Sequence, residues 1–579
     1  MAERAAAPPV ELRLLRRAWG LAGDAYVRLL AVRPLYVLGV LVLAQWLTVL
    51  SWALTVRHNG WLYYQGGDQT YYYSSAWSIA HGHIPQSPIG YGWSLLLAPL
   101  AGIAGTNILG ALPAIVVLQA AVLLPLGLLG VYGIGERIAG RTLGYLAAAG
   151  WIVAPFLATP GFVHRYHERW VEQFLPQAFG FTGLADFLSM IVVVGAAYVF
   201  LRALDTDGAA DAAIAGLLTG FAIGVKPANV LFVAGPALAV LVARRWRVAV
   251  VYGVAILPAV LALALWKEKG LGHLPLFSSS GSGVRIAAGA TAAGLPVAGL
   301  PGYLDLNWSN LGANMAQIRE FFWSMRLVEW LPLAGLVAVA RASLAKAAFL
   351  GGWLAAFVFI KGTSGSTGVQ NATFWRLLMP AWPAYLLLAV SLPLLVPGVA
   401  RALKRHVPVP RTLAWRSVPV VAAAAALAAV PVVAMAALPA AHGRAIVDDY
   451  DFNTLVPVAD FGLRATVHGS EVTLTWSRRH SAGVNEFYRV YQSRPSGQTP
   501  VGGLSEYRDG IACVSQRSGA SSCRLLMHLL PPTRATHAVN EPGPGGQTYR
   551  VALLANWIDD TGKGDVLLVS EPVTVTVAR

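Results

Sequence analysis

A lone carboxylate in the stretch QGGDQTYYYSSAWSIAHGH (Gln65 to His83) is the first group placed to do chemistry. Asp68 follows a long apolar run by about a dozen residues, in a part of the chain where acids are rare. A carboxylate in such a place can take a proton from an attacking hydroxyl, which is general-base catalysis. The competing interpretations are a solvated loop acid and a helix N-cap.

Three cations complement that base. A leaving phosphate gains negative charge as its bond breaks, and fixed cations stabilise this charge. Arg376, Lys226 and Arg165 are the candidates; Arg binds phosphate through two donors at once, whereas Lys acts as a compact point charge. Arg376 also fits a residue that snorkels at a helix end. Lys226 precedes Pro227, and a charge at membrane depth indicates function.

Aromatic side chains follow Asp68 directly. Tyr71, Tyr72 and Trp77 could pack against the faces of a sugar or against lipid. An interfacial aromatic belt explains the same residues, and for the tyrosines we prefer it.

The segment HRYHERWVEQ (His164 to Gln173) is a second polar cluster. Its candidate ligand-binding side chains are His164, His167, Glu168 and Glu172. Their spacing can put a His and a Glu on one helical face, as a metal site needs. Arg165 and Arg169 would repel a cation, so we expect an acceptor-binding or ion-paired helix. We predict no metal site, and a divalent cation is not favoured as a cofactor.

These residues are set in a strongly apolar chain. It has 579 residues, 56% hydrophobic and 12% charged, and a net charge of +15. Soluble proteins carry about a quarter charged residues. Before residue 440, apolar runs recur that are long enough to cross a ~30 Å hydrocarbon core. The first run is longer than the apolar region of a signal peptide and no small-residue cleavage site follows it, so we expect a retained helix.

Eleven membrane spans are predicted. They lie near 35–56, 110–133, 142–159, 183–203, 212–226, 228–243, 248–266, 330–341, 346–361, 378–397 and 417–440. With a cytoplasmic N-terminus, the Arg/Lys-rich linkers then all face the cytoplasm, as the positive-inside rule requires. This placement of the positive charge argues against nucleic-acid binding. The aromatic segments, including 57–109 and 267–329, face outward, and Tyr91 to Gly105 suits a helix at the interface.

The composition changes after residue 440. Alternating polar and apolar residues occur in EVTLTW, FYRVYQ, TYRVALLAN and VTVTV, between 471 and 577. This pattern predicts a small all-β sandwich in residues 441–579, after a helical membrane domain in 1–440. The strands resemble those of a fibronectin type III domain. Cys513 and Cys523 lie here, and an outward-facing domain favours their pairing over two free thiols.

Four segments, taken in order with Asp68, resemble the GT-C superfamily of polytopic glycosyltransferases. They are PIGYGWSLLLAPLAGIAG (Pro88 to Gly105), ERIAGRTLGYLAAAGWIVAPFL (Glu136 to Leu157), AIAGLLTGFAIGVKPANVLFV (Ala213 to Val233) and FWRLLMPAWPAYLLL (Phe374 to Leu388). That superfamily includes protein O-mannosyltransferases, lipid A aminoarabinose transferases and mycobacterial arabinofuranosyltransferases. In it, an acid in the first outer loop is the base or an acceptor anchor, which implies this role for Asp68. Many members carry paired acids, whereas this chain has Gly67-Asp68-Gln69.

The residues and the resemblance together predict a membrane glycosyltransferase. Its donor would be a polyprenyl-phosphate sugar, and its acceptor a glycan, lipid or protein hydroxyl. The Ala, Gly, Val and Arg bias is typical of a high-GC bacterial genome, so the expected location is the outer face of a bacterial plasma membrane. One alternative is a polysaccharide or lipid transporter or flippase, although no internal repeat of spans is found. Another is a membrane-anchored adhesion protein or receptor, which would not need eleven spans.

Overall fold

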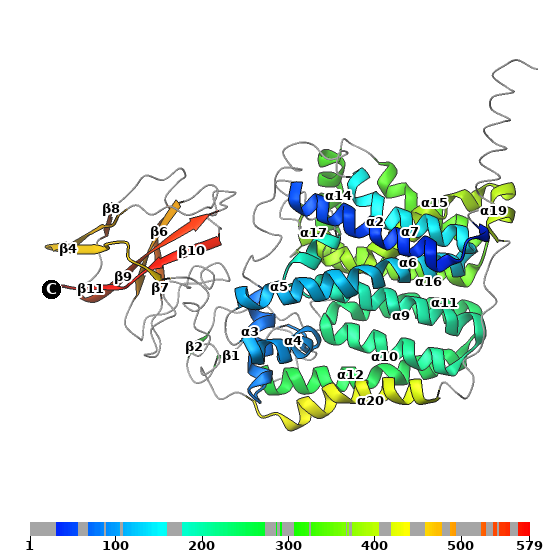
Figure 1. Ribbon diagram of the computed structural model, residues 1–579, viewed down its shortest axis with the longest axis horizontal. Helices are drawn as coiled ribbons and strands as arrows, with labels where there is room; N and C mark the ends of the chain where they lie inside the picture. The colour runs from blue at the N-terminus through cyan, green and yellow to red at the C-terminus, as the bar shows by residue number, and fades with distance from the viewer. Residues whose placement is uncertain are drawn as a thin grey trace, which may run out of the picture.

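The chain folds into helices up to residue 440 and mainly into strands after residue 458 (Figure 1). The computed structural model describes residues 30–55, 68–85, 89–104, 108–158, 176–271, 285–286, 290–291, 306–322, 326–365, 367–369, 373–404, 418–440, 458–477, 487–493, 523–528, 537–540, 544–555 and 565–578.

The helices of the first half run from α2 to α12. They are α2 (Pro34–Thr55), α3 (Asp68–Ala80), α4 (Tyr91–Ala104), α5 (Ile108–Leu118), η1 (Gln119–Leu123), α6 (Leu124–Ala139), α7 (Arg141–Ala158), η4 (Pro176–Phe181), α9 (Asp186–Thr206), α10 (Ala209–Val225), η5 (Pro227–Val233), α11 (Ala234–Ala243) and α12 (Trp246–Leu271).

A short strand pair, β1 (Arg285–Ile286) and β2 (Ala290–Thr291), precedes the remaining helices. These are α14 (Trp308–Phe321), α15 (Leu327–Ala340), α16 (Leu344–Thr363), α17 (Thr373–Leu378), η7 (Met379–Ala381), α18 (Trp382–Val390), η8 (Leu392–Leu395), α19 (Pro397–Lys404) and α20 (Val418–Ala437).

Eight helical segments among the described residues are long and apolar enough to cross a membrane. They are Pro34–Ser51, Ala111–Ala139, Arg141–Ala158, Asp186–Thr206, Trp246–Gly270, Leu344–Thr363, Phe374–Leu395 and Val418–Ala437. The three other predicted spans largely coincide with shorter apolar helices, which are Ala209–Val225, Pro227–Ala243 and Leu327–Ala340. Every predicted span is therefore helical, and the number of crossings stays a prediction.

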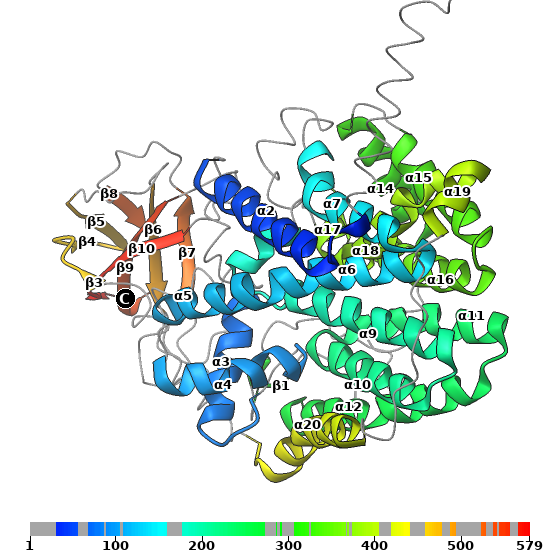
Figure 2. The same ribbon diagram turned by 45° about the vertical axis from the view of Figure 1, so that its right-hand side comes forward.

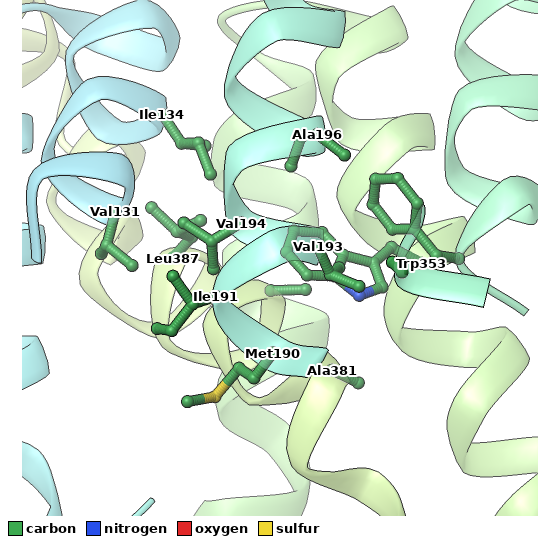
Figure 3. Packing of buried hydrophobic residues seen from close by; sticks show 14 of the residues in the cluster. Val131, Ile134, Met190, Ile191, Val193, Val194, Ala196, Trp353, Ala381 and Leu387 are labelled. Atoms are coloured by element: carbon green, nitrogen blue, oxygen red, sulfur yellow. The ribbon is translucent and has the colours of Figure 1, made fainter. Parts of the chain in front are cut away.

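Helix α9 lies at the centre of the helical domain. In the most apolar 18-residue stretch of α9, 72% of the residues are buried, whereas the corresponding share is 11% in both α2 and α20. Side chains of α6 (Val131, Ile134) and Leu387 of α18 pack on one side of α9, and Trp353 of α16 packs on the other (Figure 3). Beyond α9, helices α10, α12 and α20 follow side by side (Figures 1 and 2).

A network of ion pairs closes one end of α9. Asp205 accepts from Arg137 at 3.3 Å and from Lys346 at 2.8 Å, which ties α9 to α6 and α16. Asp207 pairs with Arg245 at 3.4 Å just beyond the helix. All five of these residues lie in linkers that are predicted to be cytoplasmic. This end of α9 lies about 30 Å from its start, given a rise of about 1.5 Å per residue.

The strands after residue 458 form two sheets. One sheet has the order β3 (Val458–Ala459), β10 (Asp565–Ser570), β9 (Gly545–Ala555), β6 (Phe487–Ser493) and β7 (Cys523–His528), with β11 (Val573–Val577) also paired to β9. The other has the order β4 (Arg464–His468), β5 (Glu471–Thr475) and β8 (His537–Asn540).

Apolar residues from both sheets share one core. Val472 and Leu474 of β5 pack in a cluster with Tyr549, Val551 and Leu553 of β9. The fibronectin type III assignment and the boundary at residue 441 stay predictions. The disulfide also stays a prediction, because Cys513 lies outside the described residues.

Candidate active site

Arg376 joins two carboxylates that are far apart in the sequence. Its Nη2 donates to Oδ2 of Asp68, which is 308 positions away. Its Nε donates to Oδ1 of Asp186 at 3.1 Å, and Nη2 donates to Oδ2 of the same carboxylate at 3.2 Å. The planar guanidinium thereby binds Asp186 through two parallel bonds, the strongest geometry available to an Arg–carboxylate pair. The helices α3, α9 and α17 meet at this point.

Lys226 completes the cluster. Its Nζ donates to Oδ1 of Asp186 at 2.7 Å, so Asp186 is held by two cations. The Asp186 side chain is 1% exposed, whereas that of Asp68 is 39% exposed. A buried carboxylate is stable only when its charge is compensated and hydrogen-bonded. Asp186 therefore forms the buried base of the cluster, and Asp68 its exposed edge.

Buried side chains place the start of α9 next to the start of α3. Gln69 Oε1 accepts from the backbone N of Gly183 at 2.9 Å. Gln119 Nε2 donates to the carbonyl of Thr182 at 2.6 Å, and Trp93 Nε1 donates to the carbonyl of Gly183 at 2.8 Å. The peptide unit between Thr182 and Gly183 is thus held from α3 and η1. Because Gln69 follows Asp68 and this turn leads into Asp186, the two acids are brought together.

Lys226 is positioned by a break between α10 and η5. Its backbone is extended (φ −136°, ψ 113°), and Pro227 begins the next helix. Asn229 Nδ2 donates to Ser189 Oγ at 2.8 Å and to the carbonyl of Ala222 at 2.7 Å, which fixes the break against α9 one turn after Asp186. The interruption between the two helices therefore places the Lys226 side chain at the cluster, because an uninterrupted helix would continue past the site.

The start of α4 packs closely against the same break. A Cβ at Gly90 would lie 2.3 Å from the carbonyl oxygen of Gly224, and one at Gly92 would lie 2.8 Å from the backbone N of Val225. Only glycine permits this approach of two backbones. The helix predicted from Tyr91 to Gly105 is present as α4 (Tyr91–Ala104), and it supports the end of α10 that carries Lys226. Its position at the membrane interface stays a prediction.

Arg376 lies on the short helix α17. The η7 turn that follows is anchored by Trp353, whose Nε1 donates to the carbonyl of Pro380 at 3.0 Å. Trp353 is itself fully buried in the core between α16 and α9 (Figure 3). The rigid core thereby fixes the backbone from which Arg376 reaches the two acids.

Tyr72 lies one helical turn after Asp68 and is 3% exposed. Burial raises the pKa of its hydroxyl, the charges of Asp68 and Asp186 raise it further, and Arg376 lowers it. The Tyr72 side chain therefore belongs to the electrostatic surroundings of the cluster. Its ring packs in the hydrophobic core, because Tyr72, Tyr73 and Ala76 share the buried face of α3. A role of Tyr72 in sugar binding stays a prediction.

Among the other predicted binding residues, Trp77 is the one whose side chain the structure describes, and it lies away from the cluster. Trp77 is half-buried on α3, and its ring lies 4.1 Å from that of His81 between centroids, at a tilt of 32°. It lies about 13 Å along the helix from Asp68. Tyr71 belongs to α3, but its side chain lies outside the described residues, as do Arg165, His164, His167, Glu168 and Glu172 entirely. Their roles stay predictions.

Asp186 is the functional candidate that the sequence interpretation missed. The signal was present, because Asp186 stands alone at the head of the apolar run DFLSMIVVVGAAYVF. An ionisable residue inside a membrane segment indicates function or an ion pair. The predicted span began at residue 183 and covered Asp186, which hid this signal.

Some hydrogen-bond donors and acceptors of the cluster remain available to a ligand. Within the described residues Arg376 is the hydrogen-bond partner of Asp68 through Oδ2, which leaves Oδ1 able to accept. Nη1 of Arg376 has no bond within the same part of the chain, and Lys226 uses one of its three donors. A proton acceptor thus lies beside cationic donors, the combination that phosphate-leaving reactions require.

The carboxylates of Asp68 and Asp186 are the oxygens a divalent cation would use here. Both already bind Arg376. Among the described residues, no group of three His, Cys, Asp or Glu side chains is arranged to hold a metal ion.

Fold and site together define a polytopic helical membrane protein with a cluster of opposite charges at the end of its central helix. No family model and no curated protein matches the chain. Among solved structures it is similar to the Archaeoglobus fulgidus oligosaccharyltransferase in the apo form, with a TM-score of 0.36 and 14% identity. It is also similar to AglB from that organism in complex with an inhibitory peptide and a dolichol-phosphate, with a TM-score of 0.39 and 16% identity.

Each comparison covers 71% of this chain and 56% of the other. This chain thus spans little more than half the length of those proteins. At these TM-scores the similarity carries no argument about function, which rests on the site itself.

Proposed function

We propose that this protein is an integral membrane glycosyltransferase that moves a sugar from a polyprenyl-phosphate donor to an acceptor hydroxyl. One observation carries the proposal: Arg376 binds both Asp68 and the buried Asp186, which also holds Lys226. A partly exposed proton acceptor and two cations are thereby assembled at one point from three distant segments. The reaction that uses both is displacement of a phosphate by a hydroxyl.

In the proposed step Asp68 is the general base. The acceptor oxygen attacks the anomeric carbon, its proton passes to Asp68, and the bond from that carbon to the phosphate oxygen breaks. The electron pair of that bond stays on the lipid phosphate, where Arg376 and Lys226 stabilise the added charge. Because Asp68 contacts Arg376, and Lys226 is held beside Arg376 by Asp186, little rearrangement is needed to align the reacting groups.

Asp186 acts in this scheme as a positioning residue. It accepts two bonds from Arg376 and one from Lys226, and it is buried. Its charge keeps both cations extended toward one point and offsets part of their cost of burial. Arg165 stays a further candidate for the phosphate, and His164, His167 and Glu168 for the acceptor.

The test is a transfer assay with membranes or nanodiscs that contain the full chain. A panel of polyprenyl-phosphate sugars, hexosyl and pentosyl, is supplied with lipid, glycan and peptide acceptors. We expect transfer from one donor by the wild type and loss of transfer in Asp68→Asn. The matched control is Asp207→Asn, because Asp207 also pairs with an arginine, but at the far end of α9.

Movement of a labelled lipid across the membrane without sugar transfer from any donor would support the transporter interpretation instead. Equal transfer by Asp68→Asn and Asp207→Asn would refute the assignment of the base.

A further inference from the structure

Lys267 is a buried ammonium group to which the proposed reaction gives no role. It lies near the end of α12 and is 5% exposed. Its Nζ donates to the carbonyl oxygen of Ile89 at 2.8 Å, and Nε1 of Trp266 donates to the same oxygen at 3.0 Å. Because consecutive residues of a helix point about 100° apart, the two side chains approach this carbonyl from different directions. The peptide that precedes α4 is therefore fixed to α12 by two donors.

The loop between α3 and α4 meets the end of α12 at a second point. A Cβ at Gly270 would lie 2.6 Å from the carbonyl oxygen of Pro85, so the two backbones are in direct contact. The backbone N of Ile84 donates at 2.8 Å to the carbonyl of Pro439, which follows α20. The described parts of this loop are thus held by α12 at Pro85 and at Ile89, and by the end of α20 at Ile84.

Helix α12 is itself fixed relative to α10, which ends at the break before Lys226. The two helices lie side by side (Figures 1 and 2). A Cβ at Gly216 would lie 2.4 Å from the carbonyl oxygen of Tyr252, and the Tyr252 hydroxyl donates to Thr219 Oγ1 at 2.9 Å. Small residues permit this close approach of two helices. A backbone segment that is bound to α12 is therefore also held in place relative to α10.

The peptide that Lys267 holds lies against the residues that precede Lys226. A Cβ at Gly90 would lie 2.3 Å from the carbonyl oxygen of Gly224 and 2.6 Å from that of Val225. Because Gly90 has no side chain, its backbone is itself the surface on which the end of α10 packs. A shift of this peptide would therefore move the backbone to which Lys226 is attached.

We infer that Lys267 is a positioning residue for Lys226: it holds the start of α4 against the break from which the phosphate-binding ammonium group extends. The part that concerns the reaction rests on the proposed function, because Lys226 is a phosphate ligand only in that proposal. An ammonium group on a flexible four-carbon chain suits this task, since it reaches from α12 and can align one of its donors with the carbonyl. The effect of Lys267 on the reaction therefore passes through Lys226.

The first experiment is a double-mutant cycle on the full chain in nanodiscs, which measures kcat and binding of polyprenyl phosphate. Lys267→Met keeps the apolar chain of the residue but removes its donors. We expect it to lower kcat by about tenfold to a hundredfold, because a misplacement of about 1 Å can have this effect. In a Lys226→Gln background the same change should have little further effect, since both residues act through one contact. A residue that only stabilised the fold would lower kcat by the same factor in both backgrounds.

Lys346→Met is the matched control. Its Nζ also donates to a carbonyl of another helix, that of Arg137 at 2.6 Å, and its side chain is 12% exposed, but it lies at the far end of α9. Lys346→Met should lower the stability of the protein and leave kcat unchanged. Trp266→Phe removes the other donor to Ile89 and should lower kcat less, because the lost bond is between neutral groups. Lys267→Arg should retain more activity than Lys267→Met, since a guanidinium can still donate.

A second measurement does not depend on activity. Amide hydrogen exchange reports the local opening of a backbone segment. The backbone N of Lys226 donates to the Ala222 carbonyl, and that of Asn229 donates to the Lys226 carbonyl, each at 2.9 Å. Both amides should exchange faster in Lys267→Met than in the wild type, whereas Lys346→Met should leave their exchange unchanged.

The outcomes separate the two proposals. A wild type that neither uses a polyprenyl-phosphate sugar nor binds polyprenyl phosphate overturns the proposed function, and hydrogen exchange then decides the inference alone. Unchanged exchange at Lys226 and Asn229 in Lys267→Met overturns the inference, as does an equal loss of kcat in the wild-type and Lys226→Gln backgrounds. If Lys267→Met does not fold, Trp266→Phe provides the same cycle and the same exchange measurement.

Discussion

Lys226 and Arg376 share a single carboxylate oxygen. Lys226 Nζ lies 2.7 Å, and Arg376 Nε 3.1 Å, from Oδ1 of Asp186. Two like charges approach this closely only because a buried negative charge lies between them. The second carboxylate, Asp68, binds the outer side of Arg376 and remains partly exposed. The spacing of the proposed phosphate-binding cations is thus set by a residue that does not itself reach the open edge of the cluster.

Asp68→Asn should lower sugar transfer by about 10²- to 10⁴-fold, the range for loss of a general base. The amide keeps the size of the side chain but accepts no proton at neutral pH. Donor affinity should not weaken, because the charge of Asp68 no longer competes with the phosphate for Arg376. Initial rates and donor binding check this, and Asp207→Asn should match the wild type in both.

Asp186→Asn should destabilise the protein by about 3 kcal/mol or more, since removal of one partner leaves buried charges uncompensated. Donor affinity should fall as well, because both cations lose the anchor that orients them. Thermal unfolding in detergent, with and without polyprenyl phosphate, measures both effects. A variant as stable as Asp207→Asn and unchanged in donor affinity would contradict the role of Asp186.

Arg376→Ala should weaken donor binding and slow turnover, because the phosphate loses a charge-assisted partner and Asp186 loses its bidentate one. Arg376→Lys should restore only part of the loss, since an ammonium cannot bridge two carboxylates with the geometry of a guanidinium. The control is Arg245→Ala, which breaks an exposed ion pair with Asp207. Donor affinity unchanged in Arg376→Ala would move the phosphate site toward Lys226 or Arg165.

The predicted topology places the C-terminal strands outside and the basic linkers inside. In a background of Cys513→Ser and Cys523→Ser, Ser515→Cys should react with a membrane-impermeant thiol reagent applied to intact cells. A cysteine placed between residues 401 and 416 should react only after the cells are opened. Labelling of Ser515→Cys only in opened cells would reverse the orientation and exclude catalysis at the outer face.

The sequence by itself determined the helices of the membrane domain. Hydrophobic runs long enough to cross a membrane have few alternatives to the helix, because a backbone in lipid must satisfy its hydrogen bonds internally. All eleven predicted spans are therefore helical, even where Pro227 shortens a segment. The isolated positions of Asp68, Arg376 and Lys226 also identified these residues as candidates, since charge is costly in an apolar setting.

Only the tertiary structure decided which charges meet. Asp68 and Arg376 are 308 positions apart, and no periodicity links them. Their contact depends on the turn held by Gln69 and on the packing of α9 in the core. The approach of Lys226 to Asp186 depends on the break that Asn229 fixes at the end of α10. The role of Asp186 became visible only in the tertiary structure, because its partners come from helices that are distant along the chain. Local sequence sets the secondary structure of a segment, whereas an ion pair depends on how complete helices pack.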